Sequence, residues 1–142
     1  MSRFALINIF MALIVITLGA LTRLLDAGLG CPDWPVCYGH PFPVSNEQAM
    51  AFTQWQFDSG KAWMEMIHRY VASLLGLSIL IQAFLIWPRY LGAARWLAVF
   101  LCGWVVLQGL FGMWTVTLRL WPPVVSAHLL GGAITIGLQF LI

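Results

Sequence analysis

Two histidines, His68 and His128, lie inside long apolar stretches of the sequence. His68 follows Met64 by four residues, and His128 follows Val124 by four residues, where their apolar stretches begin. At a helical rise of about 1.5 Å per residue, each side chain would lie about 6 Å below the end of its helix. An ionisable residue inside a membrane span is costly and marks a functional site by default. Two imidazoles at one depth on different helices are a usual way to hold a heme iron, so the pair predicts a bis-histidine heme site.

The composition indicates a membrane protein. Of the 142 residues, 61% are hydrophobic and 8% are charged, whereas a soluble domain carries about 25% charged residues. The formal net charge is only +2, and the sequence has no basic cluster. We therefore expect a lipid bilayer as the surroundings and no nucleic-acid partner.

Four segments are apolar enough and long enough to span a bilayer, which needs roughly 20 residues. They are residues 4–21, 64–87, 96–116 and 124–142. Because backbone polar groups in lipid must be satisfied internally, these spans are expected to be helices. The predicted fold class is an all-α integral membrane protein, an up-down four-helix transmembrane bundle with a long outer loop at 22–63. The prediction treats residues 1–142 as one domain, with a cleaved signal peptide as the alternative for the first span.

The two cysteines of the outer loop decide the predicted orientation. Basic residues are divided almost equally between the two sides, so the positive-inside rule does not decide it. Cys31 and Cys37 have a spacing that suits a small disulfide loop, and a disulfide requires an oxidising compartment. We therefore expect an inner (plasma) membrane protein with a cytoplasmic N-terminus and a periplasmic cysteine loop. The second and fourth helices start on the loop side in either orientation, which places both histidines at that side.

The histidines and a neighbouring glutamate each also have a less specific interpretation. A buried histidine can simply hydrogen-bond a neighbouring helix, and His40, in the loop, is expected to be solvated. Glu65 precedes His68 by three positions and shares its helix face, so it could orient the imidazole or act on a substrate. The alternative for Glu65 is an interfacial carboxylate that reaches water or pairs with Lys61.

Two arginines at the outer level, Arg23 and Arg69, are candidates for binding heme propionates. A guanidinium group suits a carboxylate geometrically. Reaching toward lipid headgroups is the ordinary alternative for such side chains.

Several of these residues fall in motifs that resemble a known family. The stretch GALTRLLDAGLGCPDWPVCYG, residues 19–39, resembles the first-loop signature of heme A synthases. The segment Glu-Met-Ile-His-Arg at 65–69 resembles the Glu-x-x-His-Arg motif that opens the second helix in that family. His128 matches the second histidine of the same half. The resemblance covers essentially the whole chain.

The resemblance implies a function in heme A biosynthesis, and so in cytochrome oxidase biogenesis. The family oxidises a methyl group of heme O to the formyl group of heme A. By resemblance, His68 and His128 would be the axial iron ligands and Glu65 the carboxylate required for the oxidation. Cys31 and Cys37 would be the redox-active or structural outer pair. The implied cofactor is heme, with heme O as substrate, heme A as product and heme b possible at the site. Heme O synthase, a protoheme farnesyltransferase, would act upstream.

The chain departs from the family in its length. Typical members have eight spans in two similar halves, and this sequence resembles the first half alone. We expect a fragment; the alternative is a short form that associates with a second copy or with the missing C-terminal half. Other function classes stay open: a b-type bis-histidine cytochrome that only carries electrons, a four-helix quinone-linked thiol oxidoreductase, and a non-catalytic scaffold subunit.

Overall fold

The protein is built from helices. The computed structural model describes residues 3–42, 44–52, 57–88 and 91–142. The helices are α1 (Arg3–Leu24), α2 (Asn46–Phe52), α3 (Ser59–Ile86), α4 (Ala93–Thr117) and α5 (Pro122–Phe140). All except α2 are long and apolar enough to cross a membrane. The predicted all-α fold with four apolar spans is therefore confirmed.

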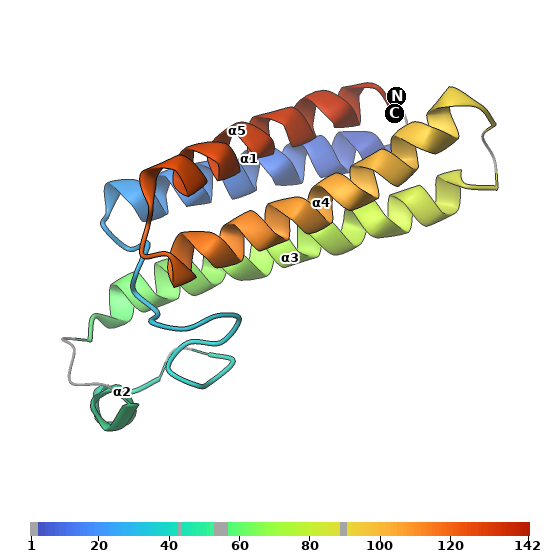
Figure 1. Ribbon diagram of the computed structural model, residues 1–142. Helices are drawn as coiled ribbons and strands as arrows, with labels where there is room; N and C mark the ends of the chain where they lie inside the picture. The colour runs from blue at the N-terminus through green and yellow to red at the C-terminus, as the bar shows by residue number, and fades with distance from the viewer. Residues whose placement is uncertain (1–2, 43, 53–56, 89–90) are drawn as a thin grey trace.

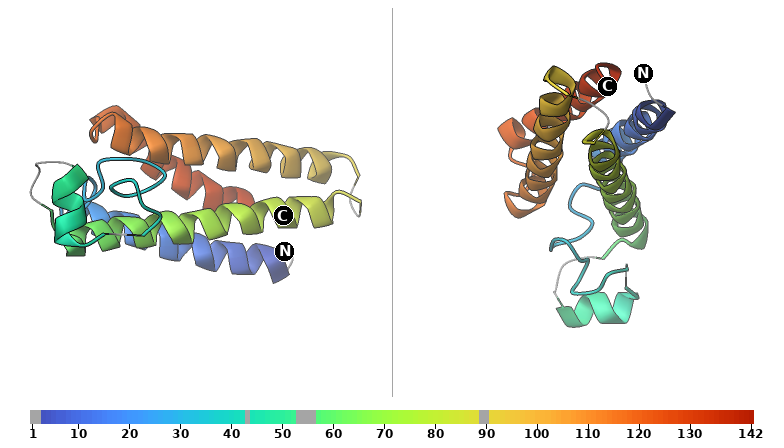
Figure 2. Two further views of the ribbon diagram at one scale, coloured as in Figure 1. Left: turned by 90° about the horizontal axis from the view of Figure 1, so that it is seen from below. Right: turned by 90° about the vertical axis from the view of Figure 1, so that its right-hand side faces the viewer.

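The four long helices form an up-down bundle (Figure 1). α1 packs against α3 and α5, and α4 packs against the same two helices. α3 and α5 therefore occupy diagonally opposite corners, as the end-on view in Figure 2 shows. Both chain ends and the α3–α4 connection lie at one end of the bundle, which we call the inner end. The segment between α1 and α3, including α2, lies at the other end, which we call the outer end.

Polar residues outside the apolar run determine where α3 begins. The sequence predicted a span from residue 64, but α3 starts at Ser59. Asp58 caps the helix, and its carboxylate accepts a hydrogen bond of 3.1 Å from the backbone N–H of Lys61. Such a cap satisfies a backbone donor that has no partner within the helix. The outer loop is correspondingly shorter than predicted.

The outer loop also contains a helix, α2, that the sequence analysis did not predict. Ser45 and Gln48 form a reciprocal capping box at its start. The backbone N–H of Ser45 donates to Oε1 of Gln48 at 3.1 Å, and the backbone N–H of Gln48 donates to Oγ of Ser45 at 3.4 Å. Ala49 is the buried residue of this helix. The short α2 therefore packs onto the outer end instead of hanging free as a loop.

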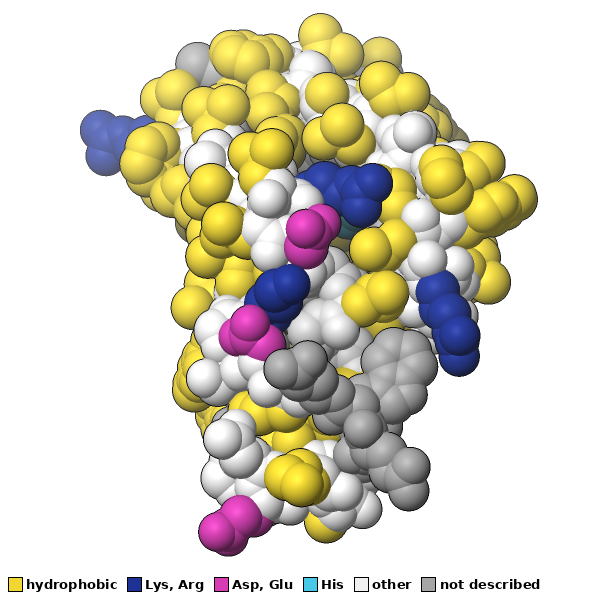
Figure 3. Space-filling model, turned by 90° about the vertical axis from the view of Figure 1, so that its left-hand side faces the viewer, with side chains coloured by type: hydrophobic (Ala, Val, Ile, Leu, Met, Phe, Trp, Pro, Cys, Tyr) yellow, Lys and Arg dark blue, Asp and Glu magenta, His cyan; other side chains and the backbone are white. Residues whose placement is uncertain are grey.

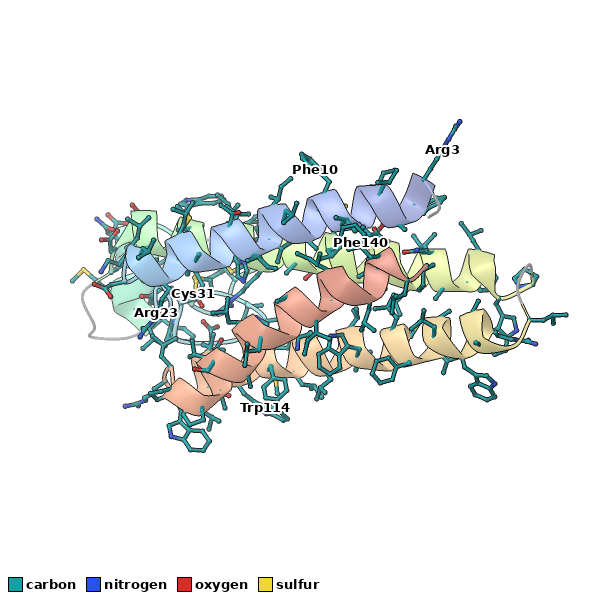
Figure 4. All side chains as sticks on the ribbon, turned by 90° about the horizontal axis from the view of Figure 1, so that it is seen from above. Arg3, Phe10, Arg23, Cys31, Trp114 and Phe140 are labelled. Carbon is teal, nitrogen blue, oxygen red and sulfur yellow. A yellow bond between two sulfur atoms is a disulfide. The ribbon has the colours of Figure 1, made fainter. Side chains whose placement is uncertain are left out.

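Apolar side chains lie both in the core of the bundle and on its surface. Ala12, Leu75, Ile79 and Leu101 form a buried cluster between three helices. Large apolar side chains also cover the outside, and Phe10, 65% exposed, points away from the bundle in Figure 4. Such an exposed apolar surface on a helical bundle is expected for contact with lipid.

Hydrogen bonds join α1 to α3 in the inner half of the bundle. Nδ2 of Asn8 donates to Oε1 of Gln82 at 2.5 Å, and Oδ1 of Asn8 accepts from Oγ of Ser78 at 2.6 Å. Asn8 and Gln82 are fully buried. Asn8 thus provides both a donor and an acceptor between two helices in apolar surroundings, where such bonds help to fix helix pairing.

Replacing Asn8 with alanine is expected to lower the free energy of unfolding by about 1–2 kcal/mol. The loss leaves the buried polar groups of Gln82 and Ser78 without this partner, and an unsatisfied buried group costs about 1–3 kcal/mol. Equilibrium unfolding in mixed micelles would measure the change. Thr17→Ala is the matched control, because the exposed Thr17 hydroxyl donates to the Leu13 carbonyl of its own helix. Equal stabilities of the two variants would contradict the prediction.

Candidate functional site

The two histidines singled out by the sequence lie in the outer half of the bundle. His68 belongs to α3 and His128 to α5, and both side chains are half-buried. The two imidazoles therefore come from diagonally opposite helices, in the same half of the bundle.

Each imidazole rests against a glycine of the preceding long helix. A Cβ atom placed on Gly19 of α1 would lie 3.0 Å from Cε1 of His68. A Cβ atom placed on Gly112 of α4 would lie 3.5 Å from Cε1 of His128. The His68 ring also meets the backbone of Val15, and the His128 ring meets the backbone of Gln108. The two histidines thus have closely similar surroundings.

One nitrogen of each ring has no protein partner. Nδ1 of His68 and Nδ1 of His128 are buried and make no hydrogen bond within the described part of the chain. Buried polar atoms are normally hydrogen-bonded, so each exception calls for an explanation. Across residues 3–42, 44–52, 57–88 and 91–142, no group of three or more His, Cys, Asp or Glu side chains is placed to hold a metal ion. Two unpartnered imidazole nitrogens fit a heme iron, for which the protein needs to supply only the axial ligands.

Glu65 is the buried carboxylate of the outer half. It is 4% exposed. Its Oε2 accepts a hydrogen bond of 2.9 Å from the backbone N–H of Cys31, and its Oε1 lies 2.5 Å from Nη2 of Arg69. A buried carboxylate needs such partners, because burying an unpaired charge is very costly. The partner of Glu65 is therefore Arg69 and not Lys61, the residue that the sequence analysis considered.

Arg69 connects α3 to the cysteine loop. Cys31 and Cys37 form a disulfide. Nη1 of Arg69 donates to the carbonyl of Val36, next to Cys37, at 2.8 Å. Since Glu65 accepts a hydrogen bond from the N–H of Cys31, Glu65 and Arg69 of α3 together hold both ends of the disulfide-closed segment. We call this arrangement the α3 clamp.

Aromatic residues attach the rest of the loop to the bundle. The ring of Tyr38 contacts Phe52 and Phe57 edge to face, and the Tyr70 hydroxyl of α3 donates to the carbonyl of Pro41. Burial raises the pKa of Tyr38, and the nearby Asp33 and Glu65 carboxyls raise it further. Tyr38 therefore remains protonated near neutral pH and does not add another charge next to Glu65.

The two predicted propionate partners lie in different surroundings. Arg69 is half-buried and engaged by Glu65 and the loop carbonyls. Arg23 lies exposed in the last turn of α1, at the same end as Cys31 (Figure 4). Figure 3 views this outer end, where Lys, Arg, Asp and Glu side chains gather beside apolar surface. The side chain of His40, the third histidine, is exposed in the loop as expected.

Replacing Arg69 with lysine is expected to speed reduction of the Cys31–Cys37 disulfide by roughly tenfold or more. Lysine keeps the charge but lacks the planar fork that reaches Glu65 and Val36 together. Losing a hydrogen bond to a charged group costs about 1.5–3 kcal/mol, and about 1.4 kcal/mol corresponds to a factor of ten. Timed quenching with a thiol-alkylating reagent after addition of dithiothreitol would measure the rate. The exposed Arg23→Lys is the matched control, and equal rates in both variants would refute a role for the α3 clamp.

The two glycines that contact the histidines were not among the predicted site residues. A signal was present, because Gly19 and Gly112 each lie in the last two turns of a helix that ends at the side where the histidine helices begin. Counting residues back from that side places the glycines at about the depth of the histidines.

Comparison with known proteins relates the whole chain to one family. The COX15-CtaA family model, described as a cytochrome oxidase assembly protein, matches residues 2–142. The heme A synthase of Shewanella oneidensis is 45% identical over 141 residues, which cover 96% of this chain and 42% of that protein. The heme A synthase of Hyphomonas neptunium is 32% identical over 133 residues, which cover 81% of this chain and 38% of that protein.

A third relative has a lower identity and again matches only part of its own length. The heme A synthase of Shouchella clausii is 28% identical over 115 residues, which cover 79% of this chain and 34% of that protein. No solved structure is significantly similar to the chain. The chain spans about two fifths of the length of the curated relatives it matches.

Proposed function

This chain belongs to the COX15-CtaA family of cytochrome oxidase assembly proteins, and we propose that its bundle forms a bis-histidine heme site in which heme O is oxidised to heme A. The observation that carries the proposal is the pair of buried, unpartnered Nδ1 atoms on His68 and His128. They come from diagonally opposite helices and lie in the same half of the bundle. The family's relatives that bear the name heme A synthase support the choice of reaction.

In this proposal His68 and His128 would hold the heme through its iron. Heme, when bound, supplies the redox-active iron and carries the methyl group that becomes a formyl group. The helices α3 and α5 would fix the position of the group between them. The contacts of each ring with the backbone of Val15 or Gln108 would hold the imidazoles in orientation, as the non-coordinating nitrogens of metal-bound histidines usually require.

Glu65 is proposed as the group that takes up a proton during the oxidation. It precedes His68 by three residues on α3, so the carboxylate lies on nearly the same helix face as the proposed iron ligand. A positioned carboxylate contributes by general base catalysis when a proton leaves the reacting group. Arg69 and the N–H of Cys31 hold its two oxygens in place.

The arginines and the cysteines have supporting roles in the proposal. Arg23 is exposed at the outer end and suits a propionate there. Arg69 would combine propionate binding with its role in the α3 clamp. The Cys31–Cys37 disulfide fits an oxidising compartment. We accordingly propose a periplasmic outer end and a cytoplasmic inner end in the inner (plasma) membrane.

The length of the chain is relevant to whether it could convert heme O by itself. Since the chain spans about two fifths of its curated relatives, we propose that it works together with a C-terminal half or with a second copy of itself. Heme O synthase, a protoheme farnesyltransferase, would supply the substrate. These partners follow from the family and from the chemistry of the substrate.

The test is to purify the full chain in detergent, supply heme O, and record absorption spectra of the oxidised and reduced protein. Pyridine-hemochrome typing and chromatography of the extracted heme would then identify the product. A low-spin bis-imidazole spectrum together with formation of heme A would support the synthase. Stable heme binding without conversion, even when a C-terminal half is added, would favour a b-type cytochrome. A chain that binds no heme under either condition would contradict the proposed site.

A further inference from the structure

The same two contacts, one with a glycine and one with a backbone group, recur around each of the two histidines. On α1, Val15 and Gly19 are four residues apart and both contact His68. On α4, Gln108 and Gly112 are four residues apart and both contact His128. Residues four apart lie one above the other on the same helix face. Each imidazole therefore lies along one helix face. The glycine on that face has no side chain, and the backbone contact lies one helical turn closer to the inner end of the bundle.

The absence of a side chain at the glycine makes this arrangement possible. A Cβ atom at residue 19 would come within 3.0 Å of Cε1 and 3.4 Å of Nε2 of His68. Contacts this short are rare for real Cβ atoms, so the ring would have to move by a few tenths of an ångström. The same atom at residue 112 would come to 3.5 Å and 3.8 Å of Cε1 and Nε2 of His128, which is ordinary van der Waals contact. The fit is therefore tighter at His68 than at His128.

We propose that Gly19 and Gly112 are positioning residues for the two iron-binding imidazoles, an inference that rests on the proposed heme site. Each glycine lets its histidine lie against the backbone of the preceding helix, which sets the rotation of the ring. A side chain too large for the space at the glycine displaces the ring from the backbone of Val15 or Gln108; a methyl group is already too large at Gly19, and a larger group is needed at Gly112. Loss of such a contact beyond the metal ligands typically weakens metal binding by about 10- to 100-fold.

The contact distances predict a graded response to substitution. Gly19→Ala should weaken binding of added ferric protoheme by about tenfold and change the low-spin electron paramagnetic resonance signal, because the imidazole is rotated. Gly112→Ala should bind protoheme as the unchanged protein does, because the methyl group fits. Gly112→Val, which is larger, should show both the weaker binding and the altered signal.

Gly109 provides the matched control on the same helix. A Cβ atom at this residue meets no atom within 4 Å, so Gly109→Ala and Gly109→Val change helix propensity and β-branching without touching a ring. Both should keep the affinity and the resonance signal of the unchanged protein. Circular dichroism and thermal unfolding of every variant would separate loss of fold from displacement of a ligand.

The outcomes distinguish this inference from the proposed function. If the unchanged chain binds no protoheme, or if His68→Ala and His128→Ala bind it normally, the proposed heme site itself fails. If the heme site stands but Gly19→Ala gives the unchanged affinity and signal, the inference is overturned. Should Gly19→Ala fail to fold, the comparison of Gly112→Val with Gly109→Val decides, and identical spectra in that pair overturn it.

Discussion

Replacing either His68 or His128 with alanine is expected to abolish the low-spin bis-imidazole spectrum of the heme-loaded chain. Alanine removes an axial ligand and leaves an apolar gap that cannot bind iron. Because even a group beyond the ligands typically contributes about 10- to 100-fold to affinity, we expect protoheme binding to weaken by more than about 100-fold. Titration of the purified variants with ferric protoheme, followed in the Soret band, would measure it.

His40→Ala is the control for both substitutions. It removes an imidazole from the exposed outer loop and leaves the bundle untouched. This variant should bind protoheme as the unchanged protein does. The assignment of the axial pair would be wrong if only one of the two bundle histidines mattered, or if His40→Ala had the same effect as they do.

Replacing Glu65 with glutamine is expected to leave heme binding within about twofold while conversion of heme O falls by about 100- to 10,000-fold, the usual contribution of a general acid or base. Glutamine keeps an oxygen that can accept from the N–H of Cys31, so the loop retains that attachment. It loses the charge and the ability to take up a proton. Heme binding by titration and heme A formation by chromatography are measured separately on the same sample, with the C-terminal half present if turnover requires it.

Glu47→Gln is the matched control for this substitution. Glu47 lies exposed in the first turn of α2, so its replacement changes the net charge equally without affecting the buried site. It should leave conversion unchanged. If Glu65→Gln converted heme O at the normal rate, the carboxylate would be a structural part of the α3 clamp only, and the function of the site would have to be reassigned.

The fold was predictable because lipid imposes simple requirements. Length and apolar character alone located four spans, and the structure has helices over all of them. The helix ends were less predictable, since polar caps such as Asp58 lie outside the apolar runs. α2 was missed because a seven-residue helix has no clear apolar period. Its capping box, Ser45 with Gln48, was the available signal.

The site was partly predictable. The depth of a residue in its membrane span can be counted along the sequence, but the rotation of a helix about its own axis cannot. Counting residues placed His68 and His128 at one depth. Which residues of α1 and α4 face the rings depends on how the helices pack, so Gly19 and Gly112 escaped notice.

The partner of Glu65 illustrates the same limit. Lys61 and Arg69 are both four residues away along α3, and the sequence does not choose between them. The fold of the cysteine loop decides, because Arg69 can bind the carboxylate and the Val36 carbonyl together.

The diagonal placement of α3 and α5 has a mechanical consequence. The chain joins α1 to α3 and α4 to α5 as two hairpins, which pack side by side. An iron atom bound by both histidines would fasten one hairpin to the other, as a removable cross-link that closes a long loop of chain. A group that binds the folded chain and is released from the unfolded one stabilises the fold in proportion to its affinity and free concentration. The loaded bundle would then resist unfolding more than the empty one, and release of the heme would loosen the contact between the hairpins.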